Sequence, residues 1–242
     1  MPRLFLLAVA CRPGGPPDAE FSVVRPAASF KATRARGSLL CLNFNRAWAD
    51  ALNRRSDGVT HFALQHDDIT PEPGWADTLA DILDATGADA VCPVIPLKDR
   101  RGLTSTGVML PGSMGRTRRL TLREAHALPT VFGVSEARAG LAIDDPFAVL
   151  LINTGLLVVR LDRPWVERFP GFQNGYDGVH RGPDGRWRAG CFSEDWTFSA
   201  WCAGNGVKTL ATTAVRCVHH GHDGDYPNGP AWGDCDTDPG ED

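Results

Sequence analysis

The chain has 242 residues, of which 43% are hydrophobic and 22% are charged, and its formal net charge is −4. This length and composition fit one soluble domain of α/β size with a substantial core. The negative net charge argues against a general nucleic-acid binder, although it leaves room for a local basic patch.

Seven cysteines are spread along the chain, and no two of them have C-x-x-C spacing. Because their number is odd and most stand in apolar contexts, we expect reduced thiols in a cytoplasmic protein and not a disulfide framework. The apolar run 4–10 is at the lower limit for a signal segment. It also fits a buried first strand of a parallel sheet, which suits the elements that follow. The sequence has no run of ~18 apolar residues, so no transmembrane segment is predicted.

The first 95 residues alternate between predicted strands and helices. Apolar residues recur at helical spacing over 38–54 and over 75–86, where Gly87 is placed to end the second helix. Residues 18–37 show no clear period, apart from a candidate short strand at 21–24. The alternation predicts a half-Rossmann, mixed α/β sheet flanked by helices in a single domain. The predicted buried strands are residues 4–10, 59–65 and 88–95.

The second half of the chain gives weaker patterns. Residues 96–146 form its basic part and fit either a solvated loop region or a lid or acceptor surface. The apolar run 147–160, interrupted at 153–155, predicts two strand segments with a bend. The other predicted elements are a short helix at 121–128, a helical turn at 164–169, a Gly-rich loop at 170–190, a helix capped by Ser193, a late strand at 207–218 and a disordered tail at 223–242.

Two adjacent carboxylates, Asp67 and Asp68, directly follow the predicted strand 59–65. In α/β proteins ligands bind beyond the carboxyl ends of parallel strands. Carboxylate oxygens suit Mg²⁺ or Mn²⁺, which in turn bind phosphates. The alternative is a solvated acidic turn before a helix, since Asp and Pro are common turn residues.

Other motifs narrow the chemistry. The sequence contains no G-x-G-x-x-G after the first strand and no Walker A lysine motif, which disfavours dinucleotide redox and P-loop chemistry. A second acidic pair, Glu194 and Asp195, lies late in the chain, and a histidine cluster follows at 219–222. Carboxylates and imidazoles that hold an ion, with a further carboxylate as base, are what a metal-assisted displacement requires.

These blocks together resemble a GT-A-fold glycosyltransferase of the family 2 type. After the apolar opening strand, L-N-F-N-R-A-W-A-D-A-L at 42–52 is similar to the family's A-R-N-x-A helix, with Asn45 at its Asn. F-A-L-Q-H-D-D-I-T-P-E-P-G-W at 62–75 is similar to the family's strand, Asp-x-Asp motif and P-x-P-x-W. The later blocks are N-T-G-L-L at 153–157, S-E-D-W-T-F at 193–198 and V-H-H-G at 218–221.

The resemblance implies a glycosyltransferase domain over 1–222, with a nucleotide-binding half at 1–95 and an acceptor and catalytic half at 96–222. It implies a nucleotide-sugar donor, with a UDP, GDP or dTDP leaving group, and Mn²⁺ or Mg²⁺ as cofactor. The acceptor, whether glycan, lipid, protein or modified nucleic acid, stays open. The implied roles are metal binding for Asp68 and His219, general base for Asp195 with Glu194 beside it, and donor binding for His66, Asp67, Asn45 and Arg12.

One residue departs from the family's pattern. His66 stands where the family's first Asp contacts the nucleotide, which puts nucleotide preference and metal dependence in doubt. An imidazole can hydrogen-bond a ribose or ligate a metal, but His66 also fits a structural histidine at a strand end. For the late metal ligand, His220 and His222 are alternatives to His219.

Three other functions are compatible with the same residues. A nucleotidyltransferase shares the sheet and the metal-carboxylate chemistry, but R-P-G-G at 12–15 is only a faint echo of its glycine-rich loop. A non-catalytic module would bind a nucleotide sugar or glycan without consuming it, and His66 is the feature in its favour. A special case of the leading hypothesis is transfer to a modified DNA base, which the basic stretch 98–119 permits.

Overall fold

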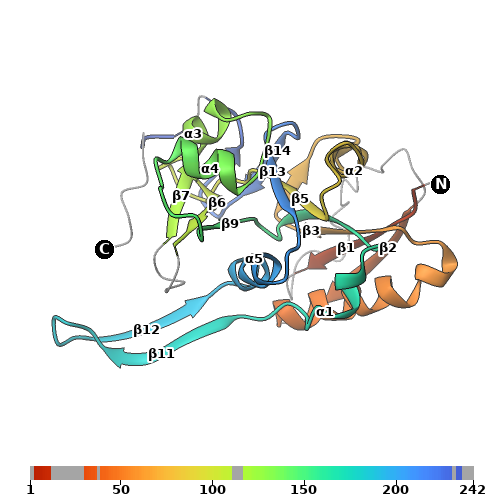
Figure 1. Ribbon diagram of the computed structural model, residues 1–242, viewed down its shortest axis with the longest axis horizontal. Helices are drawn as coiled ribbons and strands as arrows, with labels where there is room; N and C mark the ends of the chain where they lie inside the picture. The colour runs from red at the N-terminus through yellow and green to blue at the C-terminus, as the bar shows by residue number, and fades with distance from the viewer. Residues whose placement is uncertain (1–2, 12–29, 37–38, 111–116, 231–232, 236–242) are drawn as a thin grey trace.

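The computed structural model describes residues 3–11, 30–36, 39–110, 117–230 and 233–235. Over these residues the protein is a mixed α/β structure with one large sheet and three small ones (Figure 1). None of the helices in these ranges is both long and apolar enough to cross a bilayer. The helices are α1 (Leu40–Asn53), α2 (Trp75–Thr86), α3 (Leu122–Ala127), α4 (Val134–Gly140) and α5 (Glu194–Gly204), with short 3-10 turns η1 (Arg55–Asp57) and η2 (Pro164–Glu167).

The large sheet has seven strands in the order β2-β1-β3-β10-β5-β13-β8. Strand β1 is parallel to β2 and β3, and β10 is antiparallel to both β3 and β5. Strands β1, β3, β5 and β13 therefore end at the same edge, where β10 begins. These strands are β1 (Phe5–Cys11), β2 (Phe30–Arg36), β3 (His61–His66), β5 (Ala90–Pro93), β8 (Val131–Phe132), β10 (Leu156–Arg160) and β13 (Thr209–Thr212).

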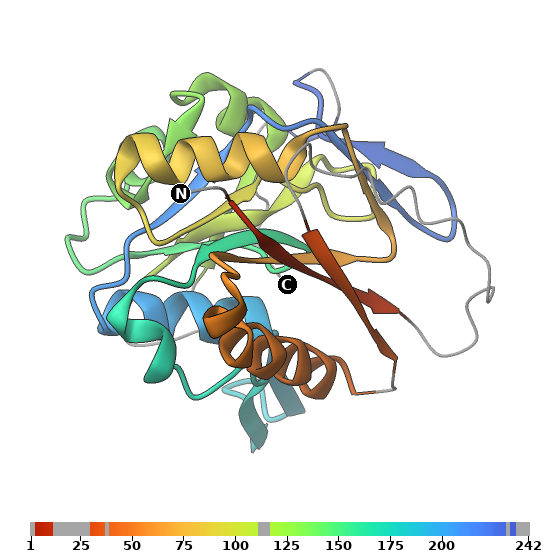
Figure 2. The same ribbon diagram turned by 90° about the vertical axis from the view of Figure 1, so that its right-hand side faces the viewer.

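Helices cover both faces of this sheet, as Figure 2 shows, and each face carries a layer of buried apolar side chains. Helix α2 lies on one face, where Trp75, Leu79 and Leu83 are fully buried against the strands. Helices α1 and α5 lie on the other face, around an aromatic cluster in which Trp48 and Phe169 are 5.6 Å apart. Alternating side chains of the strands supply both layers, which is why β1, β5 and β10 consist almost wholly of apolar residues.

Three small sheets complete the fold. Strand β14 (Cys217–His220) lies between β15 (Asp225–Pro227) and β4 (Ile69–Pro71), which follows β3 after a two-residue turn. Strand β6 (Leu103–Met109) pairs with β7 (Thr117–Thr121) and with β9 (Val149–Leu151). Strands β11 (Gly175–Arg181) and β12 (Trp187–Phe192) form a hairpin that projects from the start of α5 (Figure 1).

Several sequence-based predictions are confirmed, and three are wrong. The predicted helices at 38–54 and 75–86, the bend at 153–155 and the turn at 164–169 are all present. Residues 170–190 are not a loop, because most of them belong to the β11–β12 hairpin. The late strand 207–218 is two strands, β13 and β14, in different sheets. Part of the predicted disordered tail is ordered, since β15 pairs with β14; the candidate strand 21–24 lies outside the described residues.

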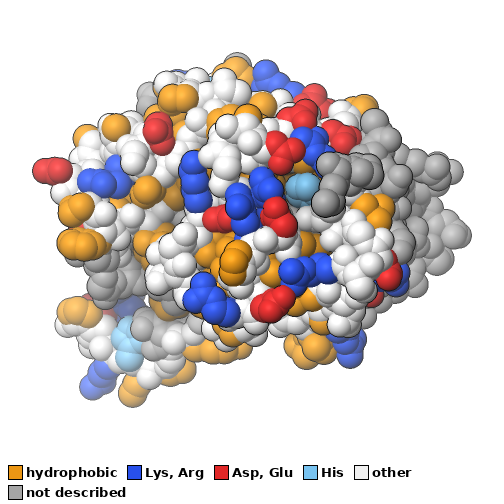
Figure 3. Space-filling model, turned by 45° about the vertical axis from the view of Figure 1, so that its right-hand side comes forward, with side chains coloured by type: hydrophobic (Ala, Val, Ile, Leu, Met, Phe, Trp, Pro, Cys, Tyr) orange, Lys and Arg blue, Asp and Glu red, His pale blue; other side chains and the backbone are white. Residues whose placement is uncertain are grey.

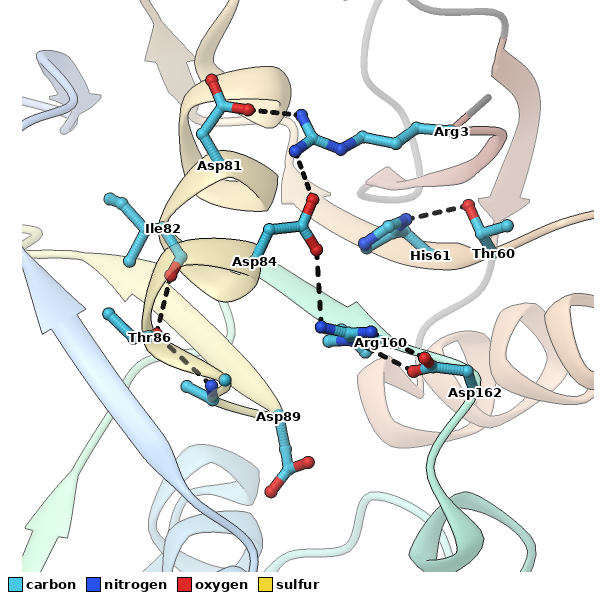
Figure 4. A network of polar contacts seen from close by, with 12 residues as sticks. Arg3, Thr60, His61, Asp81, Ile82, Asp84, Thr86, Asp89, Arg160 and Asp162 are labelled. Carbon is cyan, nitrogen blue, oxygen red and sulfur yellow. Dashed lines mark hydrogen bonds and ion pairs between the residues drawn. The ribbon is translucent and has the colours of Figure 1, made fainter. Parts of the chain in front are cut away.

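The opposite edge of the large sheet carries a network of ion pairs, drawn in Figure 4. Arg3 binds Asp81 at 2.6 Å and also Asp84, both on α2. Arg160, at the end of β10, binds Asp162 at 2.6 Å and Asp84 at 3.4 Å. These pairs tie α2 to the sheet, but most are solvent-exposed and each contributes little, about 0–1 kcal/mol.

His61 lies beneath this network and makes folding stability depend on pH. Its side chain is 6% exposed and stacks on Phe5 with ring centroids 5.1 Å apart. Burial lowers the pKa of His61 to about 4; the nearby carboxylates of Asp84 and Asp162 oppose this shift weakly, and the guanidinium groups of Arg3 and Arg160 add to it. His61 is therefore protonated below about pH 6.5 in the unfolded chain but only below about pH 4 in the folded protein. Between these values, acid favours the unfolded state.

We expect His61→Phe to remove this acid-dependent loss of stability. Between pH 6.5 and 4 the wild type should lose on the order of 3 kcal/mol relative to the variant, because each pKa unit corresponds to about 1.4 kcal/mol. Phenylalanine keeps the ring that packs on Phe5. Urea unfolding of both proteins at pH 7, 5.5 and 4.5 measures the difference, and parallel stability curves would contradict the assignment.

Candidate functional site

The carboxyl edge of the large sheet brings the predicted site residues together. Asp67 and Asp68 form the turn between β3 and β4, directly after the carboxyl end of β3. Pairing of β14 with β4 places His219 opposite Ile69, and the His220 N–H donates to the Asp68 carbonyl at 2.8 Å. Strand register therefore holds the late histidine beside the early carboxylate, although about 150 residues separate them in the chain.

Asp68 is the most strongly paired carboxylate of the site. Its side chain is 15% exposed, and one oxygen, Oδ2, forms an ion pair with Lys98. The other, Oδ1, lies 3.7 Å from Nε2 of His219. Burial alone would raise the pKa of Asp68, but hydrogen bonds to His219 and Lys98 outweigh it, so the pKa falls well below its usual range. Asp68 is therefore a carboxylate at every physiological pH.

His219 has the orientation expected of a metal ligand. Its Nδ1 lies 2.7 Å from the carbonyl oxygen of Pro96. A carbonyl only accepts hydrogen bonds, so Nδ1 is the donor to Pro96 and Nε2 is the ring nitrogen that faces Asp68. Metal-bound histidines are held in the same way, by donation from the second ring nitrogen to a carbonyl or carboxylate.

The two alternative histidines are less suited to this role. Both ring nitrogens of His220 have partners, with Nε2 2.8 Å from the Thr70 hydroxyl and Nδ1 2.6 Å from Asp225. His222 is exposed beyond the end of β14. The geometry thus favours His219 among the three, as the sequence comparison with the family predicted.

A divalent cation fits this donor set with two protein ligands. Among the described residues, no group of three or more His, Cys, Asp or Glu side chains is arranged to hold a metal. One carboxylate oxygen and one imidazole nitrogen that lie 3.7 Å apart suit Mn²⁺ or Mg²⁺ when substrate phosphates and water fill the other positions, as is usual for Mg²⁺. Asp68 and His219 would be the residues that hold the ion.

His66 ends β3 and is half-buried. Its ring packs on Phe44 at a centroid distance of 5.4 Å. Its backbone N–H donates to the Gly155 carbonyl at 2.8 Å. Within the described structure, the buried Nε2 has no hydrogen-bond partner. Burial lowers the pKa of His66, so the ring is neutral near pH 7. A neutral ring with an unused nitrogen is consistent with both interpretations of His66, and donor contact stays a prediction.

Glu194 begins α5, and its carboxylate is bound by the loop 153–155 between β9 and β10. Its side chain is 7% exposed, and Oε1 accepts a hydrogen bond from the Thr154 hydroxyl at 2.9 Å. The loop itself is fixed by Asn153, whose amide donates to the Pro93 carbonyl at 2.8 Å. The N-T-G motif thus joins the carboxyl end of β5 to the start of α5, and Glu194 faces the interior instead of an open pocket.

Asp195, the next residue, has a different environment. Its Oδ1 accepts hydrogen bonds from the Ser193 hydroxyl and, at 2.8 Å, from the Trp196 N–H. Ser193 occupies the N-cap position of α5, as predicted, but its hydroxyl binds Asp195 and makes no capping hydrogen bond to the helix backbone. Burial raises the pKa of Asp195 to about 6, although the hydrogen bond from Ser193 acts in the opposite direction. A carboxylate with this pKa can accept a proton near neutral pH.

The remaining predicted donor-binding residues are less informative. The Asn45 amide is engaged on both sides by Phe172, donating to its carbonyl at 2.9 Å and accepting from its N–H at 2.6 Å. Asn45 thus holds the loop before the β11–β12 hairpin, and its contact with a donor stays a prediction. Asp67 is half-buried in the β3–β4 turn. Arg12 lies outside the described residues.

Two site residues were not recognised in the sequence. Lys98, which pairs with Asp68, belongs to the basic stretch that we could not assign to an element. Arg119, on β7, places its guanidinium 5.0 Å from the ring of Trp196, beside Asp195. Neither belongs to a motif, and only the accumulation of basic residues at 98–119 indicated that this stretch takes part in binding.

Comparison with known proteins gives a likeness of fold. No protein-family model matches the chain, and no curated protein matches it. Among solved structures the chain is similar to A197 from STIV, with a TM-score of 0.50 and 15% sequence identity over 90% of this chain and 85% of that one. At this identity the match shows that the two chains share a mixed α/β fold, and it assigns no activity.

Proposed function

We propose that the protein is a glycosyltransferase that moves a sugar from a nucleotide-sugar donor to an acceptor hydroxyl, with inversion at the anomeric carbon. The observation that supports this most directly is that two carboxylates with different pKa values lie at the same edge of the large sheet. Asp68 is permanently ionised beside His219, whereas Asp195 has a pKa of about 6. Donor neutralisation and proton abstraction need these two kinds of carboxylate.

The arrangement suits a single displacement. The Asp195 carboxylate takes the proton of the acceptor hydroxyl while that oxygen forms a bond to the anomeric carbon. The bond from this carbon to the diphosphate oxygen breaks, and the nucleoside diphosphate leaves with the electron pair. Charge on the diphosphate grows as the bond breaks, and cationic groups near Asp68, including Lys98, reduce the cost of that charge. Mn²⁺ or Mg²⁺, when bound by Asp68 and His219, would supply further neutralisation.

The topology supports a GT-A-like arrangement as part of the proposal. Parallel strands β1, β3 and β5 end at the site edge, and the antiparallel β10 is inserted between β3 and β5. In this arrangement residues 1–95 would bind the nucleotide and 96–222 the acceptor. Such a division matches the placement of Asp67 and Asp68 after β3 and of Asp195 on α5.

A donor screen by thermal shift tests the proposal. UDP-, GDP- and dTDP-sugars are added with Mn²⁺, Mg²⁺ or EDTA, and the melting temperature is recorded. A ligand that binds only the folded state adds about 2.7 kcal/mol of stability at 100 times its dissociation constant. We expect one nucleotide class to stabilise the protein and to be hydrolysed or transferred slowly even without the true acceptor.

The other functions give different results in the same screen. Release of pyrophosphate from a nucleoside triphosphate and a sugar phosphate would identify a nucleotidyltransferase. Stable binding of an intact donor that is never consumed, with any acceptor, would identify a non-catalytic module. Absence of stabilisation by every nucleotide would reject the proposed donor class altogether.

A further inference from the structure

A cavity of about 1060 Å³ opens beside Asp195. Strands β6 and β7 line one side of it, and the β11–β12 hairpin lines the other. Figure 1 shows the hairpin extending outward from the start of α5, below these strands. Ser193, which donates a hydrogen bond to Asp195, and Trp196, the next residue after Asp195, both contribute to the cavity wall. A molecule bound there would therefore lie next to the proposed base.

The wall of this cavity is basic. Four arginines line it, against the single carboxylate of Asp184, in a protein whose net charge is −4. The face of the molecule drawn in Figure 3 mixes acidic and basic side chains. The four arginines are Arg101, Arg119, Arg186 and Arg188.

Internal partners neutralise only part of this charge. Arg101 pairs with Asp99 at 2.8 Å, and Arg188 pairs with Asp184 at 3.2 Å. Within the described structure, the exposed guanidinium of Arg186 makes no ion pair. An arginine held on a hairpin without a carboxylate partner is suited to bind an anionic group of a ligand, because its planar donors match phosphate oxygens.

Two tryptophans add flat apolar surfaces to the cavity. Trp187 is 69% exposed, and only one cation contact is found at its ring, from Arg181 at 5.9 Å. Trp196 stacks on Phe192 at 6.3 Å and carries Arg119 over its ring. An exposed tryptophan beside arginine side chains suits a ring that bears an anionic substituent.

From these observations we infer that the cavity is the acceptor site and that the acceptor is a phosphorylated sugar, soluble or as the headgroup of a lipid. The assignment as acceptor rests on the proposed glycosyl transfer, whereas the ligand class follows from the cavity. Arg186 binds the phosphate, Trp187 offers its exposed ring to the sugar, and the Ser193–Trp196 end of the cavity leads to Asp195. The volume matches the upper range of small-molecule sites, about 300–1,000 Å³. Among the described residues these arginines line a single pocket that is partly open to solvent, and they do not form a stripe along the surface, which favours a small phosphorylated molecule over a nucleic-acid strand.

Calorimetric titration of the full-length protein without donor tests this inference. The probes are glucose 6-phosphate, glucose and a single-stranded oligonucleotide. We expect glucose 6-phosphate to bind and glucose to bind at least tenfold more weakly. Arg186→Gln should weaken glucose 6-phosphate at least about tenfold, as expected for loss of a charged hydrogen bond. Arg168→Gln is the matched control, because Arg168 is exposed and outside the cavity, and it should leave the affinity unchanged.

The outcomes separate the sources and the hypotheses. Vesicles of phosphatidylcholine with phosphatidylinositol phosphate that displace glucose 6-phosphate assign the lipid form, and vesicles without effect assign the soluble form. Equal binding by wild type and Arg186→Gln, or tighter binding of the oligonucleotide, overturns the inference. The protein could bind glucose 6-phosphate through Arg186 and yet bind no nucleotide sugar. In that case the inferred ligand class holds and the proposed transfer reaction is wrong.

Discussion

Asp195→Asn should reduce sugar transfer by roughly 10²–10⁴-fold, the usual contribution of a general base. Asparagine keeps the size of aspartate and still accepts hydrogen bonds from the Ser193 hydroxyl and the Trp196 N–H, but it has no proton affinity near neutral pH. Nucleotide and metal binding should stay within a few-fold of wild type, because Asp195 acts on the acceptor. Steady-state transfer, nucleotide affinity and melting temperature are measured on the same preparations.

The pH dependence adds a signature that a purely structural role lacks. Transfer by the wild type should increase with pH and level off above the pKa of Asp195, about 6. Stability should change in the opposite sense, since a folded-state pKa above the unfolded value of about 3.8 means that ionisation is costly in the folded protein. Between pH 4 and 7 the wild type should therefore lose stability relative to Asp195→Asn, by about 1–2 kcal/mol after allowance for partial solvent exposure.

Glu194→Gln is the matched control, because it alters the adjacent carboxylate in the same way. Glutamine can still accept the hydrogen bond from Thr154, so the loop at 153–155 should keep its position. If Glu194→Gln loses the larger share of transfer while Asp195→Asn stays near the wild-type rate, the base is Glu194 and our assignment is wrong. An Asp195→Asn protein with a lowered melting temperature and intact transfer would show a structural role for Asp195.

The sequence predicts best those elements whose spacing of apolar residues matches the face that is buried in the structure. Helix α2 has a clear apolar stripe and ends at Gly87, which adopts φ 66° in the left-handed region, so its limits agree with the prediction. The bend at 153–155 was also visible, because three polar or small residues interrupt an apolar run. In both cases local residues decide the local structure.

The β11–β12 hairpin could not be recognised in the same way. Its strands are almost wholly exposed, so they lack the apolar alternation that marks a half-buried strand. The P-D-G segment at 183–185 is a turn signal between two strands, but the surrounding glycines favoured a loop. Strand β2 is another case: it pairs with β1 along a stretch in which we found no period.

Pairings between distant residues explain why the site was only partly predicted. The resemblance to glycosyltransferases placed Asp68 and His219 in one site, and the structure brings them together through β4 and β14. Lys98 could not be found, because a lysine in a basic loop has no local feature that predicts a carboxylate partner 30 residues earlier. Lys98 bears on the metal prediction because its ammonium already pairs with the Asp68 carboxylate that a metal ion would bind.

Asp68→Ala and Lys98→Met should change nucleotide binding in opposite ways. With Mn²⁺ present, Asp68→Ala should weaken nucleoside diphosphate binding by more than the roughly 10–100-fold that loss of an outer-shell metal partner costs. With EDTA it should bind as well as wild type or better, because the Lys98 ammonium, released from Asp68, can pair with the diphosphate. The EDTA effect seen in the wild type should therefore disappear.

Lys98→Met keeps the aliphatic length of lysine and removes its charge. Asp68 then loses its ion pair, so both of its oxygens become available to a divalent cation beside His219. We expect metal-free nucleotide binding to fall at least about tenfold, since a charged hydrogen bond contributes about 1.5–3 kcal/mol, while binding with saturating Mn²⁺ is retained. Titration of UDP and GDP into both variants, with Mn²⁺ and with EDTA, gives all four comparisons. If wild type and Asp68→Ala respond identically to metal, Asp68 is not a ligand of the cation. If Lys98→Met binds nucleotide like the wild type in EDTA, the Lys98 ammonium does not contact the diphosphate.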